Sequence, residues 1–306
     1  MKDASNAVRL RSKKEKFVGI RYFRKLLWVI LVSLSVSSCG GNITIHRLEF
    51  EESRPLNESV HVQIQNVPGN TTLRGWEKSK LEVLAIIRAH SDDRAAGVQI
   101  SHQIEDGVLN VRVTWPDGGP KKGESCNLKV FLPPGGDAKI EGKDGFIKVL
   151  RMEGRLAVKG QNSAVEVINH EGDVTIENQG NHISCSEIQG RLQVRNKNGY
   201  IKVMGVQNDV DLETTNQKIE LLCFPTFQGS VRCVTENQGI QVTLGRSQVG
   251  EFALKADGGK CMWDLGKRGK LLESISQSGA TIVVGGSRAT KSLIQTSGAS
   301  VKLIVP

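Results

Sequence analysis

FIKVLRMEGRLAVKGQNS (residues 146–163), AVEVINHEGDVTIENQGN (164–181), HISCSEIQGRLQVRNKNG (182–199) and YIKVMGVQNDVDLETTNQ (200–217) are four consecutive segments of 18 residues. In every segment, apolar side chains occupy the second and fourth positions and again the eleventh and thirteenth. Such short alternations are typical of half-buried strands. Asn, Asp and Gly stand between them and tolerate the left-handed backbone of tight turns. Each segment therefore predicts two short strands joined by two turns.

The repeat extends beyond these segments. Its first apolar position is occupied, with looser spacing towards the end, by Ile147, Val165, Ile183, Ile201, Ile219, Ile240, Cys261, Ile282 and Val301. A strand of about five residues cannot bury its apolar face alone, but stacked repeats make a continuous core. We therefore predict an all-β fold in which residues 135–306 form a β-solenoid of about nine two-strand coils, with a repeat of 18–21 residues. Residues 59–134 predict a preceding β-rich region that is less regular.

Charged residues at outward positions follow the same period. One column stands one residue before the second strand of each coil and consists of Arg155, Asp173, Arg191 and Asp209. A second outward column consists of Lys148, Glu166, Ser184, Lys202 and Glu220. Opposite charges on neighbouring strands stabilise a sheet by about 0.2–1 kcal/mol per pair, and they disfavour a slip in register. We interpret the first column as a structural charge ladder, because exposed pairs bind nothing in particular.

The N-terminus has the pattern of a bacterial lipoprotein signal peptide. Residues 1–25 carry nine basic and two acidic residues, an apolar run follows, and Val36-Ser37-Ser38 precedes Cys39. We predict a signal peptide over 1–38, lipid attachment at Cys39, and a polar tether over 39–58. An uncleaved anchor is the alternative, but Leu26–Ser38 is only 13 residues long, whereas a spanning helix needs about 20.

Cleavage changes the charge of the protein. The full chain has a formal charge of +9, of which residues 1–25 supply 9 − 2 = +7, so +2 remains in the mature protein. A nearly neutral protein gives no electrostatic reason to expect a nucleic-acid partner. We expect the membrane to be a partner through the lipid. Gly40, rather than Asp, follows Cys39, which is typical of export onward to the outer membrane in a Gram-negative cell.

The sequence carries no recognisable catalytic or metal-binding motif. The six histidines lack metal-ligand spacing, and we expect them on the surface or in turns. The cysteines other than Cys39 fall on inward positions and predict core residues, with a disulfide between Cys223 and Cys233 as the alternative. Glu166 and Glu220 lie three coils apart, too far for a pair of hydrolytic carboxylates. We predict no enzyme activity, no metal and no cofactor.

Three aromatic side chains form a candidate binding strip. Phe146, His182 and Tyr200 stand just before the first inward residue of their coils, and Ala164 stands at the same position. Exposed aromatic residues are enriched at interfaces, so we hypothesise a contact with carbohydrate or protein. The alternative is that these rings cover turn edges or pack on the N-terminal strands.

The order of motifs resembles a known family. VHVQIQNVPGNTTLRGWEKSKLEVLA (60–85) is followed by LKVFLPPGGDAKIEGKDGFIKV (128–149) and then by the Gly-punctuated repeats. This order resembles a bacterial domain family of uncharacterised proteins named putative adhesins, over about Ser59 to Pro306. The resemblance implies a β-repeat fold located in the cell envelope, and it implies no catalytic residues.

These observations favour a lipid-anchored, non-catalytic β-repeat protein of the bacterial cell envelope, acting in adhesion or envelope scaffolding. A sensor or accessory lipoprotein that binds a wall polymer or a partner protein is the first alternative. An enzyme acting on envelope polysaccharide is the second, and it would need an acidic groove that the sequence does not indicate.

Overall fold

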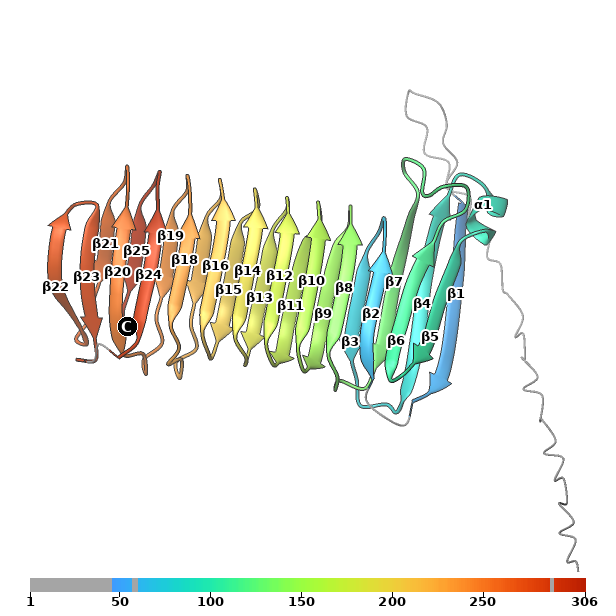
Figure 1. The fold of residues 1–306 in the computed structure, drawn as a ribbon, viewed down its shortest axis with the longest axis horizontal. Helices are drawn as coiled ribbons and strands as arrows, with labels where there is room; N and C mark the ends of the chain where they lie inside the picture. The colour runs from blue at the N-terminus through green and yellow to red at the C-terminus, as the bar shows by residue number, and fades with distance from the viewer. Residues whose placement is uncertain (1–45, 57–59, 287–288) are drawn as a thin grey trace, which may run out of the picture. The chain divides into compact units, whose positions relative to one another are not determined.

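The computed structural model describes residues 46–56, 60–286 and 289–306, which are almost entirely β-structure in two large sheets (Figure 1). The first sheet contains, in spatial order, β1 (His46–Pro55), β4 (Lys80–Ala89), β7 (Ser125–Leu132), β3 (Thr71–Gly75), β9 (Phe146–Glu153), β11 (Ala164–Glu171), β13 (Ile183–Ile188), β15 (Ile201–Val206), β17 (Ile219–Leu222), β19 (Ile240–Thr243), β25 (Val301–Ile304) and β21 (Cys261–Asp264). The second contains β22 (Gly269–Ser276), β23 (Gly279–Val284), β20 (Gly250–Ala256), β24 (Lys291–Thr296), β18 (Val231–Thr235), β16 (Val210–Thr215), β14 (Leu192–Lys197), β12 (Val174–Gln179), β10 (Leu156–Gln161), β8 (Ala138–Lys143), β2 (His61–Asn66), β6 (Val108–Thr114) and β5 (Gln99–Glu105). The all-β prediction is therefore confirmed.

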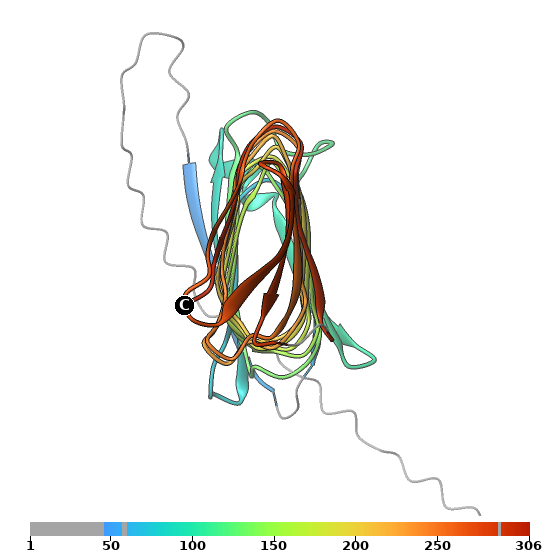
Figure 2. The same ribbon diagram turned by 90° about the vertical axis from the view of Figure 1, so that its left-hand side faces the viewer.

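From β8 to β19 the chain alternates between the two sheets, and each strand from β8 to β17 pairs in parallel with the strand two places further along the sequence. We call one strand of each sheet with its turns a coil. Val165 pairs with Ile147 and Ile183, and Ile201 pairs with Ile183 and Ile219. These registers confirm the predicted 18-residue columns. Seen end-on, successive coils nearly overlie one another (Figure 2).

The two turns of each coil use different residue types for physical reasons. At the turn from the second sheet to the first, Asp144, Asn162, Asn198 and Asn216 have φ between 52° and 63°, a conformation that Asn and Asp tolerate. Their side chains also bond along the stack, and Asn216 Nδ2 donates to Asn198 Oδ1 at 2.8 Å. At the opposite turn a Cβ added to Gly190 would lie 2.1 Å from the carbonyl oxygen of Gly172. Close backbone approach therefore favours glycine at this turn, and the same position holds Gly136, Gly154 and Gly172 in earlier coils and Asn208 in the next.

Apolar columns from both sheets fill the space between them. Ile183, Cys185, Leu192 and Val194 are fully buried and represent one coil. A polar column, made of Asn178, Asn196, Thr214, Thr235 and Thr296, is also buried at the turn into the first sheet. Its side chains donate to backbone carbonyls, as Asn196 Nδ2 does to Asn181 O at 2.8 Å and Thr214 Oγ1 does to Gly199 O at 2.7 Å. Turn carbonyls that could not pair in the sheets are satisfied in this way.

The N-terminal strands extend both sheets. Strand β3 pairs in parallel with β9, and β2 pairs in parallel with β8, so the coil made of β2 and β3 precedes the predicted repeats in space. Beyond it, β7, β4 and β1 pair antiparallel in the first sheet, and β6 and β5 pair antiparallel in the second. The short helix α1 (Asp92–Ala96) follows β4, with Ser91 Oγ accepting from the backbone N–H of Arg94 at its N-cap.

The C-terminal order differs from the prediction. Cys261, Ile282 and Val301 were expected to follow Ile240 in sequence order, but Val301 pairs with both Ile240 and Cys261 and so lies between them. Ile282 belongs to β23 in the second sheet, antiparallel to β20. The coil made of β24 and β25 is thus inserted into the stack, and the β22–β23 hairpin ends the second sheet (Figure 1). Because all these columns are apolar and inward, periodicity alone cannot distinguish the order of coils.

Candidate binding face

The predicted charge ladder lies at the glycine turn, and it also makes hydrogen bonds to the backbone. Arg155 pairs with Asp137 at 2.7 Å, and Arg191 lies 3.7 Å from Asp209. Asp173 Oδ1 accepts from the backbone N–H of Arg191 at 2.9 Å. Asp137 and Asp209 likewise accept backbone N–H groups of Arg155 and Ser230. Hydrogen bonds from the Arg155 side chain lower the pKa of Asp137, and the Ser230 backbone N–H lowers that of Asp209. This geometry is that of a coil-to-coil fastening.

The predicted aromatic strip lies on the outer side of the first sheet, and the structure brings two of its three members together. The His182 and Tyr200 rings stack with centroids 5.3 Å apart and planes 10° apart. Phe146 pairs with Ala164, so a small side chain separates Phe146 from the stacked rings. Tyr200 is 38% exposed.

Sequence reasoning missed a largely apolar column on the same surface. Its members follow one another in register and are Leu150, Ile168, Ser186, Met204 and Leu222. Met204 is 42% exposed and Leu222 is 48% exposed. The 18-residue spacing of these residues was visible in the sequence. The column was hard to recognise because the residue after each of its members has a positive φ and interrupts the alternation of inward and outward side chains. These residues are Arg151, Asn169, Glu187 and Gly205.

The charged column predicted from Lys148 to Glu220 lies between the aromatic and apolar columns. Its members pair in the expected register, and Lys148 lies 2.6 Å from Glu166. Glu220 lies 2.6 Å from Lys218, which continues the aromatic column. We call the outer surface of β9, β11, β13, β15 and β17, with these three columns, the first face.

The outer surface of the second sheet is different in character. It carries a ladder of alternating charge that sequence reasoning also missed. The ladder has one member on each of β8, β10, β12, β14 and β16, and in register these are Glu141, Lys159, Glu177, Arg195 and Glu213. We call this outer surface the second face. The sequence signal for this ladder is again a spacing of 18 residues between charges of alternating sign.

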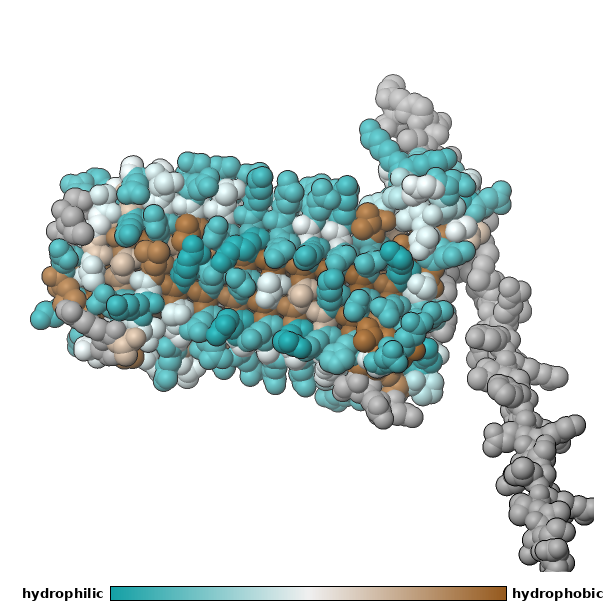
Figure 3. Space-filling model, in the orientation of Figure 1, coloured by the Kyte–Doolittle hydropathy of each residue, from teal (hydrophilic) through white to brown (hydrophobic). Residues whose placement is uncertain are grey.

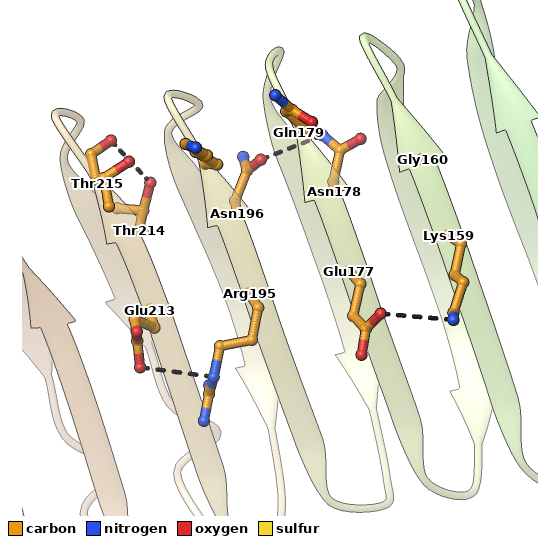
Figure 4. Close-up of a pocket in the computed structure, with 11 residues that line it drawn as sticks. Lys159, Gly160, Glu177, Asn178, Gln179, Arg195, Asn196, Glu213, Thr214 and Thr215 are labelled. Carbon is orange, nitrogen blue, oxygen red and sulfur yellow. Dashed lines mark hydrogen bonds and ion pairs between the residues drawn. The ribbon is translucent and has the colours of Figure 1, made fainter.

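The charges of the second face are extensively paired within the chain. Lys159 lies 3.8 Å from Glu177, and Arg195 lies 3.5 Å from Glu213 (Figure 4). Asp211 accepts from Arg195 at 2.5 Å and from Arg232 at 2.8 Å. A shallow depression of about 490 Å³ lies over these residues. The second sheet lies in front in Figure 1 and in the same view in Figure 3. On this side, rows of hydrophilic residues run along the stack on either side of a hydrophobic band.

Carboxylates, metal ligands and thiols are the groups that catalysis most often uses. Ser184 and Lys202 separate Glu166 from Glu220 in register. Among residues 46–56, 60–286 and 289–306, no three His, Cys, Asp or Glu side chains are grouped so that they could hold a metal ion. The five cysteines of this part of the chain are free and buried. Burial raises the pKa of Cys126, Cys185 and Cys223 to about 12, which keeps these thiols protonated and unreactive.

One histidine contradicts the expectation of surface or turn positions. His170 is 1% exposed and occupies an inward column between Met152 and Ile188. Its Nε2 lies 2.9 Å from the carbonyl oxygen of Gly154, while its Nδ1 is buried without a hydrogen-bond partner among the described residues. Burial lowers the pKa of His170. The positive φ of Asn169 turns the next residue, His170, inward, which the sequence spacing did not reveal.

The predicted signal peptide, Cys39 and residues 40–45 of the predicted tether lie outside the described residues. Residues 46–55 of that tether instead form strand β1, which pairs with β4. Within the part of the chain that the structure describes, no helix is both long and apolar enough to cross a membrane.

Neither a family model nor a curated protein matches the chain. Solved structures similar to it include a "putative lipid binding protein" from Parabacteroides distasonis, at 14% identity and a TM-score of 0.40, covering 83% of this chain and 96% of that one. A "putative adhesin" from Parabacteroides merdae matches at 11% identity and a TM-score of 0.39, covering 83% and 95%. A "putative adhesin" from Bacteroides fragilis matches at 13% identity and a TM-score of 0.32, covering 84% and 97%. Membership of the family that the sequence resembles stays a prediction.

Proposed function

We propose that this protein is a lipid-anchored, non-catalytic β-solenoid of the bacterial cell envelope, which acts in adhesion or scaffolding by binding a partner through the first face. The observation that carries the proposal is the exposure of Met204, Leu222 and Tyr200 beside a column of charges on a flat, regular surface. Apolar and aromatic side chains provide contact area, and the charges beside them provide specificity.

The contrast with the second face supports this choice. Both faces carry ion pairs within the chain, such as Arg195 with Asp211 on the second face and Lys148 with Glu166 on the first, so the faces differ in their apolar residues. Among the described residues, no large hydrophobic side chain on β8, β10, β12, β14 or β16 is exposed. A surface that lacks apolar anchors offers a partner little free energy.

The form of the stack suits binding better than chemistry. Coil-to-coil ladders hold the side chains of the first face at strand spacing, about 4.8 Å apart. Such a repeating surface meets an extended partner at many equivalent points. A lipid at Cys39, joined to β1 by the short segment before His46, would hold this surface beside the membrane.

The first experiment tests the anchor. The full chain and Cys39→Ala are expressed in a bacterial host with radiolabelled palmitate, and the mass of the mature N-terminus is measured. We expect label only in the parent chain and a product that begins at residue 39. An unlabelled protein that retains residues 1–38 would contradict the anchor.

The second experiment tests the face. The full chain is immobilised and the retention of isolated envelope fragments is measured for Met204→Ser/Leu222→Ser and for a matched control, Leu271→Ser/Leu272→Ser. Leu271 and Leu272 are 37% and 38% exposed in the terminal strand β22. We expect retention to fall at least tenfold for the first variant only. Equal retention by both variants would exclude the first face as the binding surface.

A further inference from the structure

The charges on the central column of the first face have a particular symmetry. Lys148, Glu166, Ser184, Lys202 and Glu220 follow one another in register, with the signs plus, minus, neutral, plus and minus. Reversing the order of the column exchanges every plus with a minus and leaves the neutral Ser184 in place. A surface with this property attracts its own reversed copy.

We propose that the partner of the first face is a second copy of this chain, bound face to face about a two-fold axis that runs along the strands through β13. The proposal rests on the proposed function only in taking the first face as the binding surface. The rotation reverses the order of coils and keeps each column opposite itself. Lys148 then faces Glu220 of the second copy, and Glu166 faces Lys202 of the second copy.

The two flanking columns are compatible with the same rotation. In the apolar column, Leu150 faces Leu222 of the second copy and Ile168 faces Met204 of the second copy. The exposed Met204 and Leu222 are thereby covered by the more buried members of the column. In the aromatic column, the small Ala164 lies opposite the large Tyr200, and Phe146 lies opposite Lys218, a cation that can rest on an aromatic ring.

Another axis in the plane of the interface gives a worse match. A two-fold axis along the stack would place each coil opposite itself, so that Lys148 faced Lys148 and Glu166 faced Glu166. Like charges directly opposed across an interface disfavour association. Charge complementarity therefore selects one of the two orientations.

The same reasoning limits the extent of the contact. One coil beyond the column, Thr72 lies opposite Gln241, and both are uncharged. One coil further, Lys129 lies opposite Lys302, and both are exposed cations. The contact thus covers seven strands, from β3 to β19, over about 30 Å along the stack and about 16 Å across it. A footprint of about 500 Å² per copy is smaller than the roughly 800 Å² of a standard interface, so we expect a reversible dimer.

Cross-linking at the two-fold axis tests the arrangement. Ser184→Cys places one new thiol near the axis in each copy, and facing sheets pack about 10 Å apart, which a short bis-maleimide can span. Thr175→Cys, exposed on the second face, is the matched control, and the parent chain controls for Cys39. The full chains are treated in isolated membranes, and dimer is measured on a denaturing gel. We expect cross-linked dimer from Ser184→Cys alone, and its loss when Lys202→Glu is added.

The outcome that overturns the proposal is equal cross-linking of Ser184→Cys and Thr175→Cys, or cross-linking that Lys202→Glu leaves unchanged. Lys159→Glu is the matched charge reversal on the second face, and we expect it to have no effect. If Cys39 is not labelled by palmitate while Ser184→Cys still cross-links, the proposed lipid anchor is contradicted and the proposed dimer is supported. Should envelope fragments be retained through the first face while Ser184→Cys yields no dimer, the partner is a different molecule.

A pair of charge variants makes the test independent of any single substitution. Lys148→Glu/Lys202→Glu makes the column uniformly acidic, and Glu166→Lys/Glu220→Lys makes it uniformly basic. We expect each variant alone to sediment as a monomer in detergent solution, and their equimolar mixture to form a heterodimer. Dimers of either variant alone, or a mixture that stays monomeric, would contradict the proposed pairing.

Discussion

Between β8 and β17 the same few contacts tie every coil to the next, whereas the loop at the N-terminal end is organised around one buried arginine. In the middle, glycine, asparagine and charged columns repeat at each coil, so that no one member is unique. At the end, Arg94 of α1 is 8% exposed, and its Nε lies 2.6 Å from Glu124, which is 3% exposed. Glu124 also accepts the backbone N–H groups of Lys121 and His90. Redundant contacts hold the middle, and one satisfied buried pair organises the loop that closes the end.

The largest effect is expected at that end, from Glu124→Gln. The substitution removes the buried counter-charge of the Arg94 guanidinium and leaves the exposed Asp117 at 3.4 Å. Breaking a buried pair in this way costs about 3–5 kcal/mol of unfolding free energy. Chemical denaturation measures the loss. Glu177→Gln removes a carboxylate that is 61% exposed in the middle of the stack and should change the free energy by less than about 0.5 kcal/mol.

The same pair predicts a dependence on pH. Hydrogen bonds from Arg94 and two backbone N–H groups outweigh desolvation and lower the pKa of Glu124 from 4.5 to about 2. The unfolded state therefore binds this proton more readily, and the stabilisation is complete above pH 4.5 and lost as the pH falls towards 2. Glu124→Gln should remove this part of the pH dependence. An unchanged acid slope would show that the pair does not hold the end.

The next effect is expected in the middle, from Gly172→Ala. Gly172 has φ +130°, and an added Cβ would lie 2.1 Å from the carbonyl oxygen of Gly154. Backbone strain and the forced shift together should cost about 2–4 kcal/mol. Gly107→Ala is the matched control, because Gly107 has φ +75° but open space around its Cβ position. It should cost about 1 kcal/mol. Equal losses would mean that the coils do not approach as closely as described.

A smaller effect is expected from His170→Ile, which supplies the residue type of Ile188 in the same column. Burial lowers the pKa of His170, so the unfolded state binds this proton more readily and stability falls as the pH drops below about 6.5. The variant removes a buried nitrogen without a partner and should be about 1 kcal/mol more stable than the parent at pH 5. Met152→Ile, in the neighbouring coil, should keep the parental slope between pH 7 and 5.

The smallest effect on stability is expected from Lys202→Glu on the first face and Lys159→Glu on the second. Both are outward, single-site reversals, and each should change the unfolding free energy by less than about 0.5 kcal/mol. They should differ in association, because only Lys202 faces a carboxylate of the proposed second copy. Sedimentation of both variants at matched concentration would test this difference, and identical behaviour would remove the distinction between the faces.

Much of the stack could be predicted from the sequence because its cause is local. A period of 18 residues, with Ile, Val and Leu at inward positions and Asn, Asp and Gly at turns, specifies two strands per coil whatever lies further along the chain. The Arg155 to Asp209 ladder and the Lys148 to Glu220 column follow from the same spacing. The apolar column and the buried position of His170 could not be predicted in this way. A left-handed residue after each member of the apolar column shifts the alternation of inward and outward side chains by one.

The sequence by itself thus determined the all-β class, the length of a coil and the contents of its columns. Only the tertiary structure decided the order of coils at the C-terminal end, where β24 and β25 enter between β18 and β20 and between β19 and β21. It also decided which outer face is exposed and apolar, and where Arg94 meets Glu124. The physical reason is that identical inward columns can pair in any order. The choice is made by contacts such as Thr296 Oγ1 to Gln238 O at 2.8 Å, between residues that are far apart in the chain.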